Sequence, residues 1–159
     1  MRKFEKVSEK QFIKDTGLTR EVYNGITLPI RKTVDSAGYD FISYQDIIIK
    51  PKEIVKIPTG IKVDMNKGEV LFIVVRSSMG FKYNLRLCNQ VGIIDRDYYN
   101  NEGNEGHIFV ALQNEGEKEI IIKKDEAYVQ GIILKYYTTN DEVKETRKGG
   151  IGSTNKEEK

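Results

Sequence analysis

Hydrophobic residues along this chain gather in short runs of strand length that are rich in β-branched side chains. The runs are Ile47–Ile49, Ile54–Ile57, Val70–Val75, His107–Leu112, Glu119–Ile122 and Gly131–Tyr137. Turn-forming segments separate them: Lys50-Pro51, Pro58-Thr59-Gly60, Asn66-Lys67-Gly68, Asn114-Glu115-Gly116 and Lys124-Asp125. This pattern predicts an all-β domain of the sandwich or jelly-roll type. Only Glu9–Thr16, which ends at Gly17, has the pattern of a short helix.

The C-terminal segment has a different composition from the rest of the chain. Thr138–Lys159 is polar and contains few residues that could build a core. We therefore predict a β domain over residues 1–137 and a flexible C-terminal tail over residues 138–159.

Composition narrows the class of protein. At 159 residues the chain fits one domain, which would bury roughly 68–70% of its unfolded surface. Its 26 basic and 24 acidic residues give a net charge of +2, too balanced to predict stable nucleic-acid binding. The single cysteine cannot form an internal disulfide, and the first ten residues lack the apolar core of a signal peptide. No apolar run approaches the roughly 18 residues of a spanning helix, so we expect a cytoplasmic protein without a membrane anchor.

Two polar segments could carry chemistry. In Ser36–Phe41 a turn of small residues delivers Asp40 at the head of a strand, although an aspartate beside a glycine is more often a turn residue. Arg76-Ser77-Ser78 follows an apolar strand and combines a guanidinium, two hydroxyls and exposed amides, which are groups that bind phosphate. An ordinary polar loop explains this second segment equally well.

A third segment, Cys88–Tyr99, places Asp95 three positions before Tyr98. Ile93 and Ile94 would pack the base of a hairpin, and its polar groups could face a small planar ligand that pairs with strand backbone groups. Solvated aspartates in a turn and a half-buried tyrosine are the alternative.

Two further segments complete the set. Lys124–Gly131 is a turn entering a strand, with Gln130 near the start, and says little by itself. Arg147–Thr154 combines an arginine with glycines and hydroxyls in a segment that cannot build a core. Such a segment could wrap a phosphate chain, or it could be a flexible linker.

In this order and at these separations, the five segments resemble the five motifs of the homotrimeric dUTPases. The resemblance runs from about Ile26 to Thr154 and is carried by AGYDF, RSS, NQVGIIDRDYY and GGIGST. The asparagine-rich Tyr99–His107 stretch is similar to bacterial and phage-type members. The resemblance implies a jelly-roll-like subunit, three copies sharing their active sites, and Mg²⁺-assisted hydrolysis of dUTP to dUMP and pyrophosphate.

It also implies roles for residues of the third segment. Asp95 would activate the water that attacks the α-phosphorus, and would contact the 3′-hydroxyl of the deoxyribose. Tyr98 would pack against the sugar and leave no room for a 2′-hydroxyl. Asn89 and the hairpin backbone around Gly92 would recognise uracil.

The remaining motif residues would act on the phosphates and the metal. The phosphate ligands would be Arg76, Ser77, Ser78 and Gln130, while Asp40 would meet the waters of the magnesium or help position the nucleophile. The tail would close from another subunit as a lid, bringing Arg147 to the γ-phosphate, Ile151 over the base, and Gly152, Ser153 and Thr154 to the phosphate chain. Because Mg²⁺ keeps several of its waters, we assign it no direct protein ligand.

Three positions depart from the family pattern: Ile151 replaces a phenylalanine, Ala127 replaces an arginine, and Asn155 replaces a glycine. Two other functions would use a similar fold. A dCTP deaminase would need a catalytic glutamate where this chain has Ala111. A dUTPase-shaped regulatory protein, which would bind a protein partner under nucleotide control, stays open.

Overall fold

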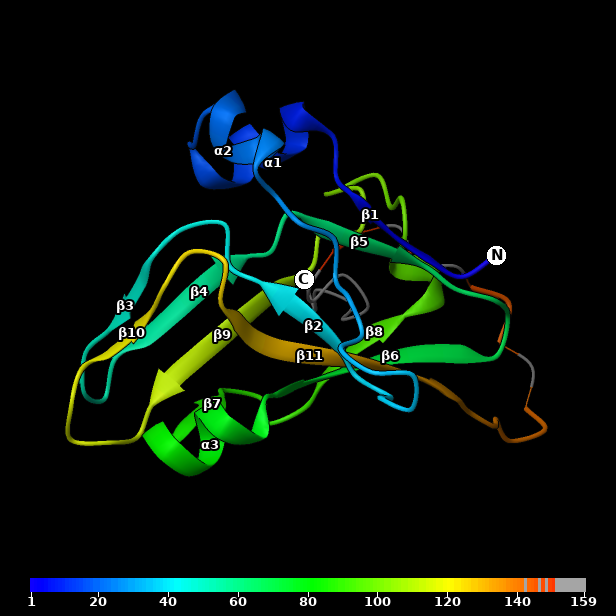
Figure 1. Cartoon of the computed structure of the whole chain (residues 1–159). Helices are drawn as coiled ribbons and strands as arrows, with labels where there is room; N and C mark the ends of the chain where they lie inside the picture. Colours follow the sequence, from blue (N-terminus) through cyan, green and yellow to red (C-terminus); the bar gives the residue numbers. More distant parts are fainter. Residues whose placement is uncertain (142, 146, 148, 151–159) are drawn as a thin grey trace, which may run out of the picture.

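The computed structural model describes residues 1–141, 143–145, 147, 149 and 150. Its strands are β1 (Lys3–Lys6), β2 (Tyr39–Ile42), β3 (Ile47–Ile49), β4 (Ile54–Pro58), β5 (Ile61–Asp64), β6 (Glu69–Val75), β7 (Leu85–Leu87), β8 (Gly92–Asp95), β9 (Phe109–Asn114), β10 (Ile120–Ile122) and β11 (Ala127–Lys135). The helices are α1 (Glu9–Thr16), α2 (Arg20–Asn24), α3 (Ser77–Tyr83) and the 3₁₀ helix η1 (Arg96–Tyr98). Figure 1 shows α1 and α2 at one end of the strands and α3 at the other.

The strands form four antiparallel sheets around one hydrophobic core. The largest has the order β2-β11-β6-β8, the second has the order β4-β9-β7, and β1–β5 and β3–β10 are two-stranded. Side chains from both larger sheets share the core, among them Leu71 and Ile73 of β6 and Val110 and Leu112 of β9. The predicted all-β, jelly-roll-like fold is confirmed.

Close packing explains one glycine of the largest sheet. Gly131 of β11 lies opposite Ile73 of β6. A Cβ atom at this position would lie 2.8 Å from the Leu71 side chain and 3.1 Å from the ring of Phe41. A larger residue at position 131 would therefore push apart the two strands that flank β11.

The predicted helix Glu9–Thr16 is confirmed. The Ser8 side chain caps its first turn by accepting from the Gln11 amide, and Gly17 ends it in the left-handed conformation, with φ 70°. The expectation that it is the only helix was wrong, since α2 and α3 also form. α3 begins directly after Arg76, in the segment for which a phosphate-binding turn and an ordinary polar loop were equally good interpretations. Its one buried residue is Met79, so the sequence of this segment has no periodic apolar pattern that would predict a helix. Among the described residues, no helix is both long and apolar enough to cross a membrane.

The predicted strand runs are confirmed, with shifted ends. Ile47–Ile49 has the expected bounds, whereas the last strand begins at Ala127 and ends at Lys135 rather than spanning Gly131–Tyr137. The sequence did not predict β1, β5 or β7. Each of these short strands pairs with a strand that is distant in the sequence, so its local pattern is weak.

The predicted hairpin at Cys88–Tyr99 was wrong. β7 pairs with β9 and β8 pairs with β6, so the turn between them crosses from one sheet to the other. Ile93 is 60% exposed, and of the expected pair only Ile94 packs against the core. A local pattern predicts which residues share a face of a strand, but it does not select the partner strand.

Candidate active site

A cleft of about 770 Å³ opens where the turn after β7 crosses between the two larger sheets. Asn89 and Gly92, two of the candidate binding residues, line it from the turn and the start of β8. Phe109 and Ala111 of β9 and Lys56 of β4 line it from the other sheet, and none of these three was predicted as a binding residue. An aromatic wall, exposed backbone and a few polar side chains suit a small planar ligand.

Asp95 lies at the end of β8, and its side chain is about half exposed. Arg147 donates a hydrogen bond from Nη2 to Asp95 Oδ2 at 2.9 Å, and its Nε lies 3.5 Å from Asp97 Oδ1. Arg147 also lines the cleft and is the least exposed of the three side chains. One guanidinium is therefore shared between two carboxylates at the rim of the cleft.

Tyr98 is buried, with 4% of its surface exposed, and lies in η1 rather than in a strand. Its hydroxyl donates to the His107 carbonyl at 2.8 Å and accepts from Asn104 Nδ2 at 2.7 Å. Burial raises the pKa of Tyr98 above its ordinary value, although the Asn104 hydrogen bond and the charge of Arg147 act in the opposite direction. The phenol is therefore neutral at pH 7, and the Arg147 guanidinium lies 5.5 Å from the centre of its ring.

A second group of predicted residues gathers at the other end of the large sheet. Arg76 Nε lies 3.1 Å from Asp40 Oδ1, and the Asp40 side chain is only 8% exposed. Gln130 of β11 lies opposite Asp40 of β2. A Cβ atom on Gly38 would lie 2.2 Å from Gln130 Oε1, so glycine there lets the first motif approach the fourth. Ser77 and Ser78 are exposed in the first turn of α3, which follows Arg76 directly.

Within one chain, the group around Asp95 and the group around Arg76 lie at opposite ends of β6. Asp95 lies opposite Val70, whereas Arg76 directly follows Val75 at the end of the strand. The six steps along the chain from Val70 to Arg76 span roughly 20 Å of extended backbone, at about 3.3 Å per residue. Asp95 and Arg76 of the same chain are therefore too distant to act on adjacent atoms of one phosphate.

The outer face of the large sheet between these two groups is apolar. Directly opposite residues of antiparallel strands share a face, and on this face lie Val70, Phe72, Val74, Ile93, Ile132 and Leu134. Ile93 is 60% exposed and Leu134 41% exposed. A hollow of about 320 Å³ on this face continues to Asp95 and Tyr136. A contiguous apolar face of this kind marks a surface that packs against another molecule.

The predicted tail only partly falls within the described residues. No helix or strand forms among its described positions, and its Gly149 and Gly150 lie beside the loop of Gly103 and Asn104. Ile151, Gly152, Ser153 and Thr154 lie outside the described residues. The resemblance implies that Arg147 serves the site of another subunit, and in this structure of one chain it contacts Asp95 of the same chain.

The residues at the cleft suit a hard cation such as Mg²⁺ that is held mainly by the phosphates of a bound nucleotide. The described part of the chain has no group of three or more His, Cys, Asp or Glu side chains arranged to hold a metal ion. Asp95 and Asp97 nevertheless present partly exposed carboxylate oxygens at the rim. Mg²⁺ prefers oxygen ligands and keeps several waters, so phosphates and one or two carboxylates would suffice.

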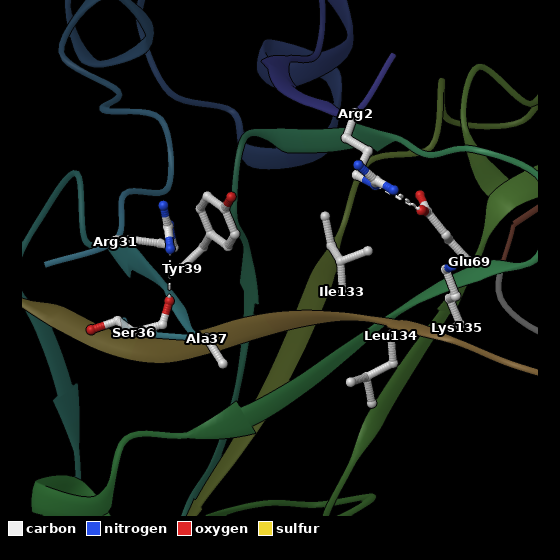
Figure 2. A pocket seen from close by; sticks show the side chains of 9 residues that line it. All are labelled: Arg2, Arg31, Ser36, Ala37, Tyr39, Glu69, Ile133, Leu134 and Lys135. Carbon is white, nitrogen blue, oxygen red and sulfur yellow. Dashed lines mark hydrogen bonds and ion pairs between the residues drawn. The ribbon is translucent and has the colours of Figure 1, made fainter. Parts of the chain in front are cut away.

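A smaller cavity, of about 320 Å³, lies beside the end of β11, which lines it with Ile133, Leu134 and Lys135 (Figure 2). Arg2 and Glu69 pair across its rim, with Nε 2.6 Å from Oε1. The guanidinium of Arg31 lies over the ring of Tyr39 and donates to backbone carbonyls of the same loop. Because these arginines already have partners, we assign this cavity no ligand.

Comparison with known proteins identifies the class. A family model described as dUTPase matches residues 24–155. The deoxyuridine 5'-triphosphate nucleotidohydrolase of Lactococcus lactis subsp. lactis (strain IL1403) is 45% identical over 133 residues, which cover 82% of this chain and 89% of that protein. The crystal structure of dUTPase from Streptococcus mutans is 37% identical, with a TM-score of 0.69, covering 87% of this chain and 98% of that one.

A third similarity concerns the fold alone. A mutant dUTPase from phage phi11 of S. aureus, described with a structural Mg(II) ion, is 19% identical, with a TM-score of 0.66, covering 91% of this chain and 97% of that one. The antiparallel sheets and the cleft between the two larger ones define a β protein with a cavity of the size that small molecules occupy. The family match over most of the chain is more specific: this chain belongs to the dUTPase family.

Proposed function

We propose that this chain hydrolyses dUTP to dUMP and pyrophosphate, with magnesium, at active sites shared between the three copies of a homotrimer. The observation that carries the proposal is the cleft between the sheets. Asp95, the buried Tyr98 and Arg147 meet at its rim, and each belongs to a segment that resembles a family motif. Family membership and relatives named for this activity support the same reaction.

Asp95 acts as the general base. Its carboxylate is partly exposed at the cleft, so it can hold a water and accept the proton as the water attacks the α-phosphorus. Negative charge then develops on the phosphate oxygens, where Arg147 and Arg76 stabilise it. A magnesium ion bound with the nucleotide supplies further charge neutralisation. On this chain Asp40 would contact the waters of the ion, and no side chain is assigned as a direct ligand.

Selection of the nucleotide follows from the walls of the cleft. Asn89 and the backbone at Gly92 offer hydrogen-bonding groups to the edge of uracil, and the Tyr98 ring packs against the deoxyribose. Ala111 lines the same cleft, where a deaminase would need its glutamate. Because alanine cannot transfer a proton, deamination at this site lacks its acid and base.

The separation along β6 supports a shared site. A second copy packed on the apolar outer face would bring its Arg76, Gln130 and first turn of α3 toward the phosphates of a nucleotide held at Asp95 of the first copy. The same packing would bury the exposed Ile93 and Leu134. The tail of a copy, with Arg147 and with Ile151, Gly152, Ser153 and Thr154, closes over the phosphates as a lid.

A substrate assay tests the proposed reaction. Pyrophosphate release is measured with magnesium and each of dUTP, dTTP, dCTP and UTP, and the expected result is at least about tenfold higher kcat/KM for dUTP, or 1.4 kcal/mol of discrimination. Equal turnover of UTP and dUTP would contradict the role of Tyr98. No turnover of any of them would instead favour a regulatory protein that binds a partner.

A mixing experiment tests the shared site. One chain carries Asp95→Asn and the other carries Gln130→Ala, and each alone should assemble with little activity. Mixed trimers should recover activity, since some sites then combine an intact Asp95 with an intact Gln130. Native mass spectrometry verifies that the chains have mixed. If mixed trimers then show no recovered activity, each site lies within one chain.

Cytoplasmic location stays a prediction.

A further inference from the structure

The segment before residue 24 lies outside the family match but packs tightly against the folded core. Val7 and Phe12 have no exposed surface, and β1 pairs with β5 along its whole length. At the start of the segment, Arg2 reaches Glu69 on β6 beside the small cavity (Figure 2). This N-terminal segment is therefore an integral part of the domain.

Two polar contacts join the N-terminal segment to the loop of residues 99–107, which follows the active-site tyrosine. The amide and the hydroxyl of Ser8 donate to the two carboxylate oxygens of Glu105, at 2.9 Å and 2.6 Å. The hydroxyl of Tyr99 donates to the carboxylate of Glu5. The segment thus holds this loop at two points.

A third contact involves His107, the only histidine of the chain, which has no exposed surface. The Gly60 amide donates to His107 Nε2 at 2.8 Å, so this nitrogen carries no proton. The proton of the neutral ring is therefore on Nδ1, which donates to Asp15 Oδ2 at 2.6 Å. Burial lowers the pKa of His107 despite the nearby carboxylate of Asp15, so the ring is neutral near pH 7. Asp15 on α1 and Gly60 fix the imidazole from opposite sides.

His107 in turn holds Tyr98. Its backbone carbonyl accepts the Tyr98 hydroxyl at 2.8 Å, and Asn104 donates to the same hydroxyl at 2.7 Å. The His107 amide donates to the Asn104 carbonyl at 2.9 Å, so both anchors of the hydroxyl move with the 104–107 turn. The position of the Tyr98 ring therefore depends on where the His107 ring is held.

We infer that Asp15, acting through His107, is a positioning residue that sets how strictly the cleft distinguishes deoxyribonucleotides from ribonucleotides. The inference rests on the proposed function, in which the Tyr98 ring packs against the sugar. Asp15 touches neither the cleft lining nor Tyr98 directly. A displacement of about 1 Å in a group that orients substrate can cost up to about 100-fold in rate, so a modest shift of this ring is enough to relax selection.

Substitutions at Asp15 test whether its hydrogen bond to His107, rather than the presence of α1 alone, controls nucleotide selection. Asp15→Leu has similar size but cannot accept from His107, whereas Asp15→Asn keeps one oxygen that can. Asp15→Leu should lower the ratio of kcat/KM for dUTP over UTP by at least about fivefold, mainly through KM, because Tyr98 contacts the sugar and not the phosphorus. Asp15→Asn should retain most of the ratio. An unchanged ratio in a folded Asp15→Leu protein would overturn the inference.

A matched control comes from the same helix. Glu9 on α1 pairs with Arg20 of α2 at 2.8 Å and does not contact the 99–107 loop. Glu9→Gln should therefore leave the nucleotide ratio unchanged, and a fall equal to that of Asp15→Leu would show that any damage to α1 has this effect. If Asp15→Leu does not fold, Asp15→Ser replaces it, because a water can then satisfy Nδ1 while the ring loses its anchor. The same fall in the ratio is expected, and an unchanged ratio again overturns the inference.

The imidazole also provides a readout that does not depend on activity. With one histidine in the chain, its ¹⁵N signals need no further assignment. The wild-type protein should show the tautomer with the proton on Nδ1, and Asp15→Leu should shift the ring toward the other tautomer. Wild-type protein with the proton on Nε2 would overturn the inference. Wild-type protein that turns over UTP and dUTP equally would instead contradict the proposed role of Tyr98, which is a different failure.

Discussion

The guanidinium of Arg147 lies 2.9 Å from the carboxylate of Asp95, although the two residues are 52 positions apart in the chain. Arg147 also reaches Asp97 and covers the ring of Tyr98. The positive group assigned to the phosphates and the negative group assigned to the water therefore meet within one chain. A nucleotide bound as proposed would draw Arg147 from the carboxylates to its phosphates and leave Asp95 free to accept a proton.

The first prediction separates the two carboxylates that share Arg147. Asp95→Asn should lower kcat for dUTP by about 10²–10⁴-fold, because an amide cannot accept the proton of the attacking water. Asp97→Asn is the matched control, since Asp97 has nearly the same exposure and the same partner. It should stay within about threefold of wild type, a change of under 1 kcal/mol in activation free energy. The rate of pyrophosphate release gives kcat for both variants. A near-normal kcat in folded Asp95→Asn would show that Asp95 is not the general base.

The second prediction concerns the buried ion pair of Arg76 and Asp40. Arg76→Ala should lower the free energy of unfolding by about 1–3 kcal/mol, because it leaves a buried carboxylate without its partner. Arg76→Lys should recover much of the stability but not the KM for dUTP, because an ammonium lacks the planar fork that binds phosphate. Urea unfolding and steady-state kinetics give the two quantities. Full recovery of KM in Arg76→Lys would show that charge alone matters there.

The third prediction tests the apolar outer face as the interface between copies. Ile93→Lys should give a folded monomer in place of a trimer, because a buried ammonium without a partner opposes association. Ile48→Lys is the control: Ile48 has a similar exposure, 53% against 60%, but lies on β3 of another sheet. Light scattering after gel filtration reports the mass. A trimer in Ile93→Lys would place the interface elsewhere.

The fourth prediction follows from the lowered pKa of His107. The folded protein holds its imidazole neutral, whereas the unfolded chain binds a proton at the ordinary pKa of about 6.5. Below that pH the unfolded state binds more protons than the folded state, so stability should fall as the pH drops from about 7 toward 5. One proton limits the slope to about 1.4 kcal/mol per pH unit.

The substitution that isolates this effect is His107→Gln, in which the amide oxygen can still accept from Gly60 but no group titrates. Nearby Glu105 has a lowered pKa, because the hydrogen bonds from Ser8 outweigh the effect of its burial, so it changes charge at lower pH. The variant should therefore lose the dependence of stability on pH between about 5 and 7, as measured by urea unfolding at several pH values. An unchanged slope would assign the dependence to another group.

Much of the candidate site could be predicted from the sequence, because groups that bind phosphate or accept a proton have to be polar residues in turns at strand ends. Asn89 and Gly92 line one cleft, Asp95 pairs with Arg147 at its rim, and Arg76, Asp40 and Gln130 lie together. The sequence did not show that these are two groups at opposite ends of β6. It also gave no signal for Lys56 and Phe109, which join the cleft only because β4 and β9 pair beside it.

The sequence by itself determined the fold class, since alternation of apolar and polar residues predicts which side chains share a face, and glycine, proline and asparagine mark the turns. Only the tertiary structure decided which strands pair, that β7 and β8 belong to different sheets, and that Tyr98 is buried. The contact of Asp15 with His107 joins residues 92 positions apart. Local backbone preferences act over a few residues, whereas such contacts depend on burial and pairing across the whole chain, and these exist only once the sheets have assembled.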